Sequence, residues 1–173
     1  MIETTRLLLR CWSESDLAPY SDICADPAVM KWIGNGSVRT QAECASAIAN
    51  FEQFWEEHGF GLFAVERRDT GDLIGFTGLA IPTFLPEVMP TVEIGWRLGK
   101  SAWGQGFATE AAKASLAFGF QEAMVDRIVS IHQAGNDASG RIIQKLGMRL
   151  ERETVDPTCN RQVRVFEVIS ESE

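Results

Sequence analysis

One glycine-rich stretch restricts the possible folds of this chain more than any other: Trp103-Gly104-Gln105-Gly106-Phe107-Ala108-Thr109-Glu110. It follows the apolar segment 92–98 and leads into a run of good helix formers, so the pattern predicts a strand, a tight loop and a helix. At such a junction several backbone N–H groups that lack helical partners point to one place, with the positive end of the helix dipole behind them. Gly104 and Gly106 let an anion approach the backbone closely, because no Cβ stands in the way. The stretch is therefore a predicted anion-binding loop, of the kind most often used for phosphate.

The rest of the chain divides into strands and helices around that loop. Short apolar runs predict strands at 6–11, 61–66, 73–79, 92–98, 127–132, 148–154 and 163–169. Helices are expected after capping boxes at Ser13 and Thr40, after the glycine loop and after Asn136, with a further short helical turn over 29–32. A strand–helix–strand unit joins parallel strands, so strand 127–132 is expected beside strand 92–98. The prediction is an α+β fold with a mixed, mostly antiparallel sheet of about seven strands, in which strands 4 and 5 are parallel, and about four helices around it.

Length and composition are those of an ordinary globular protein. A chain of 173 residues is most simply one domain, here 1–173, and its 45% hydrophobic and 23% charged content is typical of soluble proteins. No apolar run reaches the roughly 20 residues that span a bilayer, and no signal peptide is recognisable, so we expect a cytoplasmic protein with no membrane partner. The net charge of −8 argues against nucleic acid and mildly favours a cationic partner. Four widely spaced cysteines, with no histidine at ligand spacing, predict free thiols and no metal site: Cys11, Cys24, Cys44 and Cys159.

Two common phosphate motifs do not fit the loop. A nucleoside-triphosphate P-loop ends in Gly-Lys-Ser/Thr, whereas this chain has Gly106-Phe107-Ala108. A dinucleotide-binding fingerprint has a glycine where this chain has Thr109, and it opens its domain near the N-terminus. Here three predicted strands and two predicted helices come before the loop's own strand, which argues against both motifs.

The motifs around the loop, taken in their order, resemble those of the GNAT superfamily of acetyltransferases. The resemblance rests on the segments Thr5–Arg10 and Asp26–Met30, the glycine loop, Asn136-x-Ala138-Ser139, and Lys145-Leu146-Gly147-Met148. It covers nearly the whole chain and is greatest for the branch typified by ribosomal-protein-alanine N-terminal acetyltransferases (RimJ/RimL-like). The resemblance implies the GNAT fold, in which the parallel strand pair splays apart, and it implies acetyl-CoA as the co-substrate.

The resemblance also assigns residues to acetyl-CoA. Backbone amides of 103–109 would hold its pyrophosphate, strand segment 94–98 would bond its pantothenate arm, and Asn136 would contact that arm. The full cofactor-binding set is Ile94, Trp96, Arg97, Leu98, Trp103, Gly104, Gln105, Gly106, Phe107, Ala108, Thr109, Asn136, Ser139 and Lys145. Lys145 fits equally well beside the nucleotide or as a solvated helix end. Ser101 stands where the family motif usually has Gln or Arg, which predicts rearranged or weakened contacts, with Arg97 and Lys100 as nearby charges for phosphate or for solvent.

The expected reaction is direct acetyl transfer, in a ternary complex, to a primary amine of a protein N-terminus or a small molecule. It requires a base, polarisation of the thioester carbonyl by a backbone N–H of 94–96, and an acid for the departing thiolate. Many GNAT enzymes use a tyrosine as the acid where this chain has Ile143, and the resembling branch assigns the role to a serine, here Ser139. A serine at this place also fits a helix-capping role. Glu93 is the best candidate for the base, although a strand glutamate more often faces solvent, and solvent itself is the alternative.

Four further expectations complete the hypothesis. Trp32 is assigned to the acceptor site, although aromatic residues more often belong to the core. Glu110, in the first helical turn, is expected to support the loop, and His132 is expected to be structural. The protein is expected to be a monomer or a homodimer. A function of a different class also fits: a catalytically weak CoA-binding module that senses or scaffolds.

Overall fold

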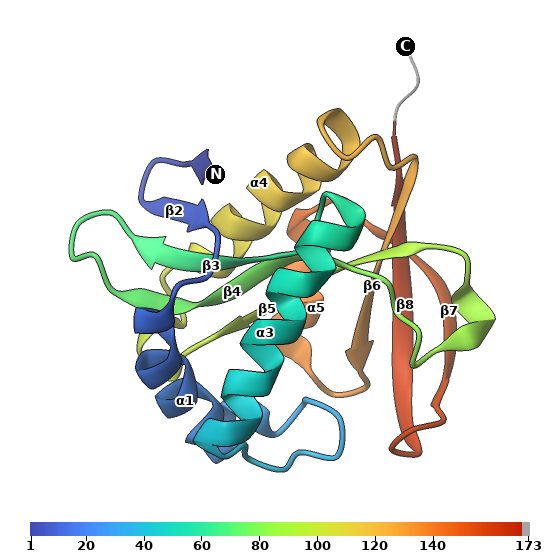
Figure 1. Ribbon diagram of the computed structural model, residues 1–173. Coiled ribbons are helices and arrows are strands. Elements are labelled where there is room, and N and C mark those ends of the chain that lie inside the picture. Colours follow the sequence, from blue (N-terminus) through green and yellow to red (C-terminus); the bar gives the residue numbers. More distant parts are fainter. Residues whose placement is uncertain (171–173) are drawn as a thin grey trace.

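Over the residues that the structure describes, the fold is built on one sheet of eight strands. The structure, a computed structural model, describes residues 1–170 (Figure 1). In sheet order the strands are β1 (Ile2–Glu3), β2 (Leu7–Arg10), β3 (Leu62–Arg67), β4 (Leu73–Ala80), β5 (Val92–Leu98), β6 (Arg127–Gln133), β8 (Arg161–Ile169) and β7 (Arg149–Asp156). Neighbouring strands are antiparallel except for the parallel pair β5 and β6. The predicted mixed sheet and its parallel pair are confirmed.

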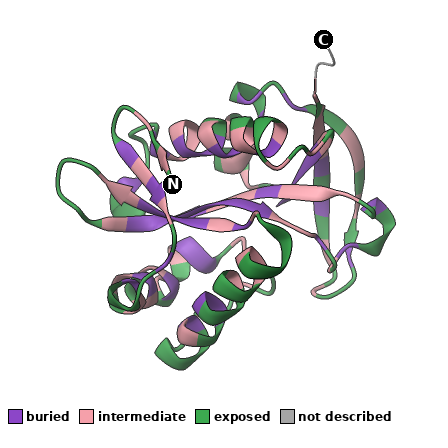
Figure 2. Cartoon of the chain, turned by 45° about the horizontal axis from the view of Figure 1, so that its top comes forward, coloured by how far each residue is buried: buried purple, intermediate pink, exposed green. Residues whose placement is uncertain are grey.

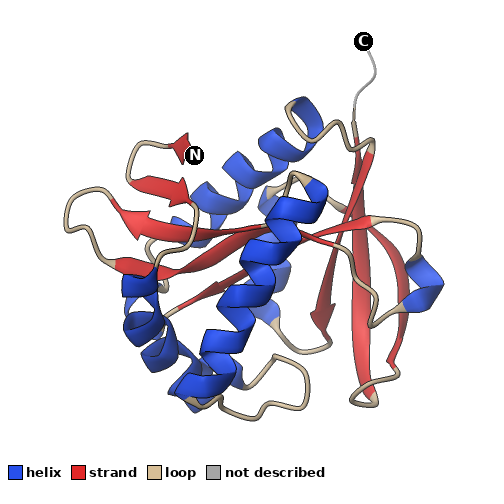
Figure 3. Cartoon of the chain, in the orientation of Figure 1, coloured by secondary structure: helices blue, strands red, loops and turns tan. Residues whose placement is uncertain are grey.

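Five α-helices in residues 1–170 accompany the sheet (Figure 3). They are α1 (Leu17–Ala25), α2 (Pro27–Met30), α3 (Gln41–His58), α4 (Phe107–Gln121) and α5 (Asp137–Lys145). None of the helices in residues 1–170 is long and apolar enough to cross a membrane.

The structure has slightly more elements than predicted. The additional strand β1 pairs with β2 over two residues only, too few for a periodic pattern to be visible in the sequence. The predicted turn over 29–32 is the short helix α2, which starts earlier because Asp26 caps it and accepts a hydrogen bond from the Ala28 N–H at 2.8 Å. Both capping boxes are confirmed: the backbone N–H of Ser13 donates to Asp16 at 2.8 Å, and that of Thr40 donates to Glu43 at 2.7 Å.

Helices cover both faces of the sheet, as Figure 2 shows. On one face α4 packs closely, because it carries small residues: a Cβ on its Gly119 would stand 2.6 Å from Cδ1 of Ile128. On the other face α1 and α3 pack against β3 and β4 around Tyr20, Cys44 and Phe76. The residues of β5 therefore alternate between two apolar layers, and each layer borders a different part of the site.

The parallel strands β5 and β6 separate soon after they meet. They pair only at Val92↔Ile128 and Glu93↔Val129. Beyond Glu93, β5 stays bonded to β4 on its other side as far as Leu98. The backbone of 94–98 thus has a free edge toward β6, and this opening is the splay implied by the GNAT resemblance.

Candidate active site

The glycine loop has the conformation that its sequence predicts. Gly104 and Gly106 adopt left-handed φ values of 73° and 82°, and Gly106 is the residue from which α4 begins. Any other residue type would be strained at these two positions. The first N–H groups of α4 lack helical partners and lie at the positive end of its dipole, so the loop is suited to an anion.

A groove of about 530 Å³ runs across this loop. It lies between α2 and its following loop, the end of β5, the glycine loop and α5. Of the residues predicted to bind the cofactor, the groove is lined by Trp96, Arg97, Leu98, Trp103, Gly104, Gly106, Phe107, Ala108, Thr109, Asn136, Ser139 and Lys145. Lys31 and Arg141 also line it, so three exposed cations surround the groove. The sequence analysis missed Arg141, although it stands four residues before Lys145 and therefore on the same helical face.

Hydrogen bonds from the N-terminal segment brace the loop. The Glu110 carboxylate accepts from Thr4 Oγ1 at 2.7 Å, from the Arg6 N–H at 2.9 Å and from Arg6 Nε at 2.7 Å. Burial raises the pKa of Glu110, but the hydrogen bonds from Thr4 and Arg6 outweigh it and hold the pKa below its ordinary value. Arg6 Nη1 donates to the carbonyl of Gln105 at 2.8 Å, and the Gln105 side chain donates to the carbonyl of Ser101. Gln105 and Ser101 therefore help to hold the conformation of the loop through these hydrogen bonds.

Removing this brace should weaken cofactor binding without touching the groove. We expect Glu110→Ala to raise the Kd for CoA roughly fivefold, because losing its charged hydrogen bonds loosens the loop by about 1 kcal/mol. Titration calorimetry measures this effect, and Glu122→Ala is the matched control, since Glu122 is exposed at the far end of the same helix. An unchanged Kd in Glu110→Ala would show that the loop holds its shape without the brace.

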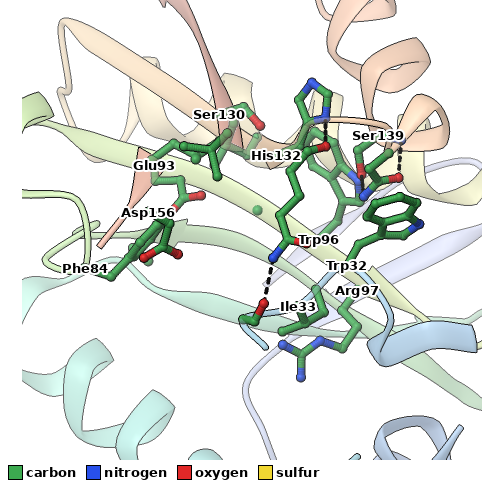
Figure 4. Close-up of a pocket in the computed structure, with 18 of the residues that line it drawn as sticks. Trp32, Ile33, Phe84, Glu93, Trp96, Arg97, Ser130, His132, Ser139 and Asp156 are labelled. Carbon is green, nitrogen blue, oxygen red and sulfur yellow. Dashed lines mark hydrogen bonds between the residues drawn. The ribbon is translucent and has the colours of Figure 1, made fainter. Parts of the chain in front are cut away.

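A pocket of about 430 Å³ opens beside the groove (Figure 4). Strand β5 contributes Glu93, Gly95 and Arg97 from one of its sides, and the intervening Ile94 and Trp96, which pack in the α4 layer, reach the pocket as well. The predicted residues Trp32, Glu93, Ile94, Trp96, Arg97, Asn136 and Ser139 line the pocket. The groove and the pocket share six residues: Trp32, Ile33, Trp96, Arg97, Asn136 and Ser139. The two cavities therefore meet at the opening between β5 and β6.

Glu93 does not face bulk solvent as an ordinary strand glutamate would. Burial raises the pKa of its carboxyl to about 8, although the backbone N–H of Ile131 donates to it and offsets part of the effect. No ion pair joins Glu93 to any of residues 1–170. The carboxyl is therefore mostly protonated at neutral pH and becomes a base slightly above it.

Ser139 and Asn136 form a hydrogen-bonded pair at the junction of the two cavities. The Asn136 side chain caps α5, because its Oδ1 accepts from the Ser139 N–H at 3.3 Å. That bond turns Nδ2 of Asn136 toward Ser139, whose Oγ accepts from it at 3.1 Å. The Ser139 hydroxyl does not itself cap the helix, so its proton is left free to donate.

Arg97 is not directed at the glycine loop or at bulk solvent, the two alternatives that its sequence position suggested. Its side chain is only 9% exposed, and its Nη1 donates to Tyr20 Oη at 3.1 Å and Cys24 Sγ at 3.5 Å. The guanidinium also lies 5.1 Å from the centre of the Phe76 ring. The reason is strand alternation, since Leu98 and not Arg97 points to the layer beneath the loop. Burial raises the pKa of Tyr20, so this only tyrosine stays a neutral structural partner of Arg97.

Hydrogen bonds from Gln133 and Arg161, here called the polar latch, hold the loop that follows Trp32 beside the pocket. Gln133 Nε2 donates to the carbonyl of Gly34 at 2.7 Å, and Arg161 Nη1 donates to Gln133 Oε1 at 2.7 Å. The same guanidinium donates to the carbonyls of Lys31 and Asn35. Nothing in the sequence connected Gly34, Gln133 and Arg161, because they lie far apart in the chain and outside the predicted strands and helices. His132, which we expected to be structural, lies against α5 with its ring stacked on Phe166 at 5.6 Å, and it also lines the pocket, where its buried Nε2 has no hydrogen-bond partner among residues 1–170.

The comparisons with known proteins agree with this geometry. The Acetyltransferase (GNAT) domain family matches residues 6–149, and the chain belongs to that family. The "uncharacterized N-acetyltransferase YnaD" of Bacillus subtilis (strain 168) is 35% identical over 150 residues, which are 87% of this chain and 83% of YnaD. A GNAT-family acetyltransferase structure from Bacillus anthracis has a TM-score of 0.79 and 25% identity, covering 97% of each chain.

A second similar structure contains coenzyme A. It is RimL, a ribosomal L7/L12 α-N-protein acetyltransferase in complex with CoA, with a TM-score of 0.77 and coverage of 96% of this chain and 95% of RimL. At 17% identity it shows only that the fold is shared. The family membership makes this protein an acetyltransferase whose acetyl donor is acetyl-CoA.

Proposed function

We propose that this enzyme transfers the acetyl group of acetyl-CoA directly to a primary amine while both are bound. The observation that carries the proposal is the meeting of the two cavities at the open edge of β5, with Ser139 at the junction and Glu93 in the pocket. A donor in the groove and an acceptor in the pocket would meet there without leaving the enzyme. No cysteine among residues 1–170 lines either cavity, which favours direct transfer over an acetyl-cysteine route.

The groove suits acetyl-CoA in shape and in charge. Its glycine loop offers backbone N–H groups to the pyrophosphate, and its exposed cations Lys31, Arg141 and Lys145 suit the remaining phosphate. The free edge of 94–98 offers backbone bonds to the amide-bearing arm, and a backbone N–H of 94–96 would polarise the thioester carbonyl. The bound co-substrate supplies the activated acetyl group, and the protein supplies position and proton transfer.

Glu93 and Ser139 are assigned opposite proton roles. Ionised Glu93 would accept the proton that the ammonium group must lose before its nitrogen attacks. The Ser139 hydroxyl, held by Asn136, would donate to the departing thiolate. Trp32 lies where the cavities meet and would close the junction from the side of the latch.

The acceptor class is a primary amine on a small molecule or at a protein N-terminus. RimL acts on a ribosomal protein's α-amino group, as its description states, and the shared fold supports a place in the RimJ/RimL-like branch. The net charge of −8 favours approach by a cationic amine.

A thiol-release assay tests this function. Purified enzyme with acetyl-CoA should release CoA only when an accepted amine is present, and mass spectrometry should find that amine heavier by one acetyl group. Calorimetry with CoA is run in parallel. Binding of CoA with no turnover on a broad panel of amines and N-terminal peptides would instead support a CoA-binding sensor or scaffold.

A further inference from the structure

The pocket contains a buried positive charge without a counter-ion. Arg97 pairs with no carboxylate in residues 1–170, and its partners are a hydroxyl, a thiol and an aromatic face. Its Nε is buried and has no hydrogen-bond partner at all. A guanidinium taken out of water is costly unless a nearby anion compensates it.

The backbone N–H of Arg39 donates to the carbonyl of Cys24, the residue whose Sγ accepts from Arg97, so a second cationic residue lies near Arg97 at the pocket. Arg39 also lines it and is only partly exposed, and no ion pair joins it to residues 1–170. Both arginines therefore line the cavity, and neither has a carboxylate partner among residues 1–170. An anionic group that entered from the pocket would meet two guanidinium groups at once.

The opposite end of the pocket is acidic. Figure 4 shows Glu93 and Asp156 together on one side, beside Phe84, and Arg97 on the other side beyond Ile33. Asp156 is buried and keeps its charge, because hydrogen bonds from the N–H and hydroxyl of Thr158 outweigh desolvation and lower its pKa. The pocket is thus charged with opposite signs at its two ends.

The floor between the two ends is open. Glu93 and Arg97 are four residues apart on the same side of β5, so their Cα atoms are separated by about 13 Å. Gly95 lies between them, and a Cβ placed on it would meet no atom within 4 Å. A ligand with two charged ends has room to lie along this strand.

We propose that the acceptor carries both charges: a primary amine that is acetylated at the Glu93 end and a carboxylate that is bound by Arg97 and Arg39. This inference rests on the proposed function and specifies its substrate class. Because the protein charges are widely spaced, the amine and the carboxylate are separated by several bonds, as in an ω-amino acid or a short peptide with an acidic side chain.

The test compares acceptors that differ only in the negative charge. 4-Aminobutyrate is assayed against its amide, 6-aminohexanoate against its amide, and the N-terminal peptide Gly-Glu-amide against Gly-Gln-amide. We expect kcat/KM to be at least tenfold higher for the charged member of one or more pairs. The pair that shows the preference distinguishes a small-molecule acceptor from a peptide.

Variants of the two arginines then test whether the preference for a charged acceptor arises in the pocket. Arg97→Gln and Arg39→Gln should each reduce the charged-to-neutral ratio at least fivefold through KM, while the Kd for CoA stays within twofold. Arg164→Gln is the control, because that exposed arginine pairs with Glu153 on β7 and should leave the ratio unchanged. Arg39→Gln keeps the test decisive if the buried Arg97 variant does not fold.

Several results would overturn the inference. These are equal kcat/KM within all three pairs, a ratio that survives both substitutions, or an Arg97→Gln effect that appears only in CoA affinity. If none of the amines is acetylated, the proposed function fails by itself, and calorimetry of the same pairs with the CoA complex decides the inference. Tighter binding of the charged members would support it, and equal or absent binding would overturn it.

Discussion

Replacing Ser139 with alanine is expected to lower kcat about 100-fold, since an acid that protonates a leaving group typically contributes 10²–10⁴-fold. The Ser139 hydroxyl stands at the junction of groove and pocket, and its oxygen already accepts from Asn136, so its proton is free for the thiolate. The Kd for CoA should change less than twofold, because backbone groups carry most of the proposed cofactor contacts. Steady-state kinetics and calorimetry on the same preparation separate these two effects.

Two further variants sharpen that experiment. Ser139→Thr retains a hydroxyl and should recover part of the lost turnover. Ser46→Ala removes an exposed serine from α3 and should behave as the wild-type enzyme. A decrease in kcat of less than threefold in Ser139→Ala would remove this residue from the proton pathway.

Replacing Glu93 with glutamine should change activity and stability in opposite directions. The base is the ionised form, and burial raises the pKa of this carboxyl to about 8, so wild-type kcat/KM should rise with pH through about 8. Glu93→Gln should lose that rise and about 100-fold in kcat/KM at pH 9. A pH–rate profile measured with one amine checks both expectations. A profile that keeps the rise near pH 8 would assign the base to another group or to solvent.

The stability effect of the same variant follows from proton linkage. The pKa of Glu93 is higher in the folded chain than in the unfolded chain, so ionisation of this carboxyl favours unfolding. The free energy of unfolding is therefore undiminished by Glu93 below pH 4.5 and falls as pH rises from there through about 8. Glutamine has no charge to bury, so the variant should be more stable than wild type at pH 9 by up to roughly 5 kcal/mol and nearly equal at pH 4. Urea unfolding at the two pH values measures this. Glu153→Gln, at an exposed position on β7, should show no such gain.

Local sequence signals were sufficient for the elements and for the loop. Capping boxes at Ser13 and Thr40 mark helix starts because the caps are made within four residues. The conformation of Gly104 and Gly106 follows from their own freedom at positive φ and from the helix that follows. Strand β1 was not foreseen, because its two residues carry no pattern.

Local sequence signals could not predict the pocket, because the residues that line it come from distant parts of the chain. The sequence left open whether Glu93 is the base or a solvent-facing strand residue, and the cover over this side of β5 comes from the loop held by Gln133 and Arg161 and from the segment that carries Phe84. That cover leaves Glu93 only partly exposed, at the wall of a pocket. The environment of Arg97 depends on which layer its strand position faces, and this required the register with β4.

The opening between β5 and β6 has a consequence for the lifetime of the protein. Without a bound arm, the central sheet contains a seam at which 94–98 has hydrogen bonds on one side only. A donor that fills the seam acts as a missing strand, and by mass action it stabilises the folded state by RT ln(1 + [L]/Kd), about 2.7 kcal/mol at a hundredfold excess over Kd. Depletion of acetyl-CoA and CoA would then do more than slow acetylation. It would leave more of the enzyme transiently open to proteolysis, so the amount of the protein itself would follow the supply of its donor.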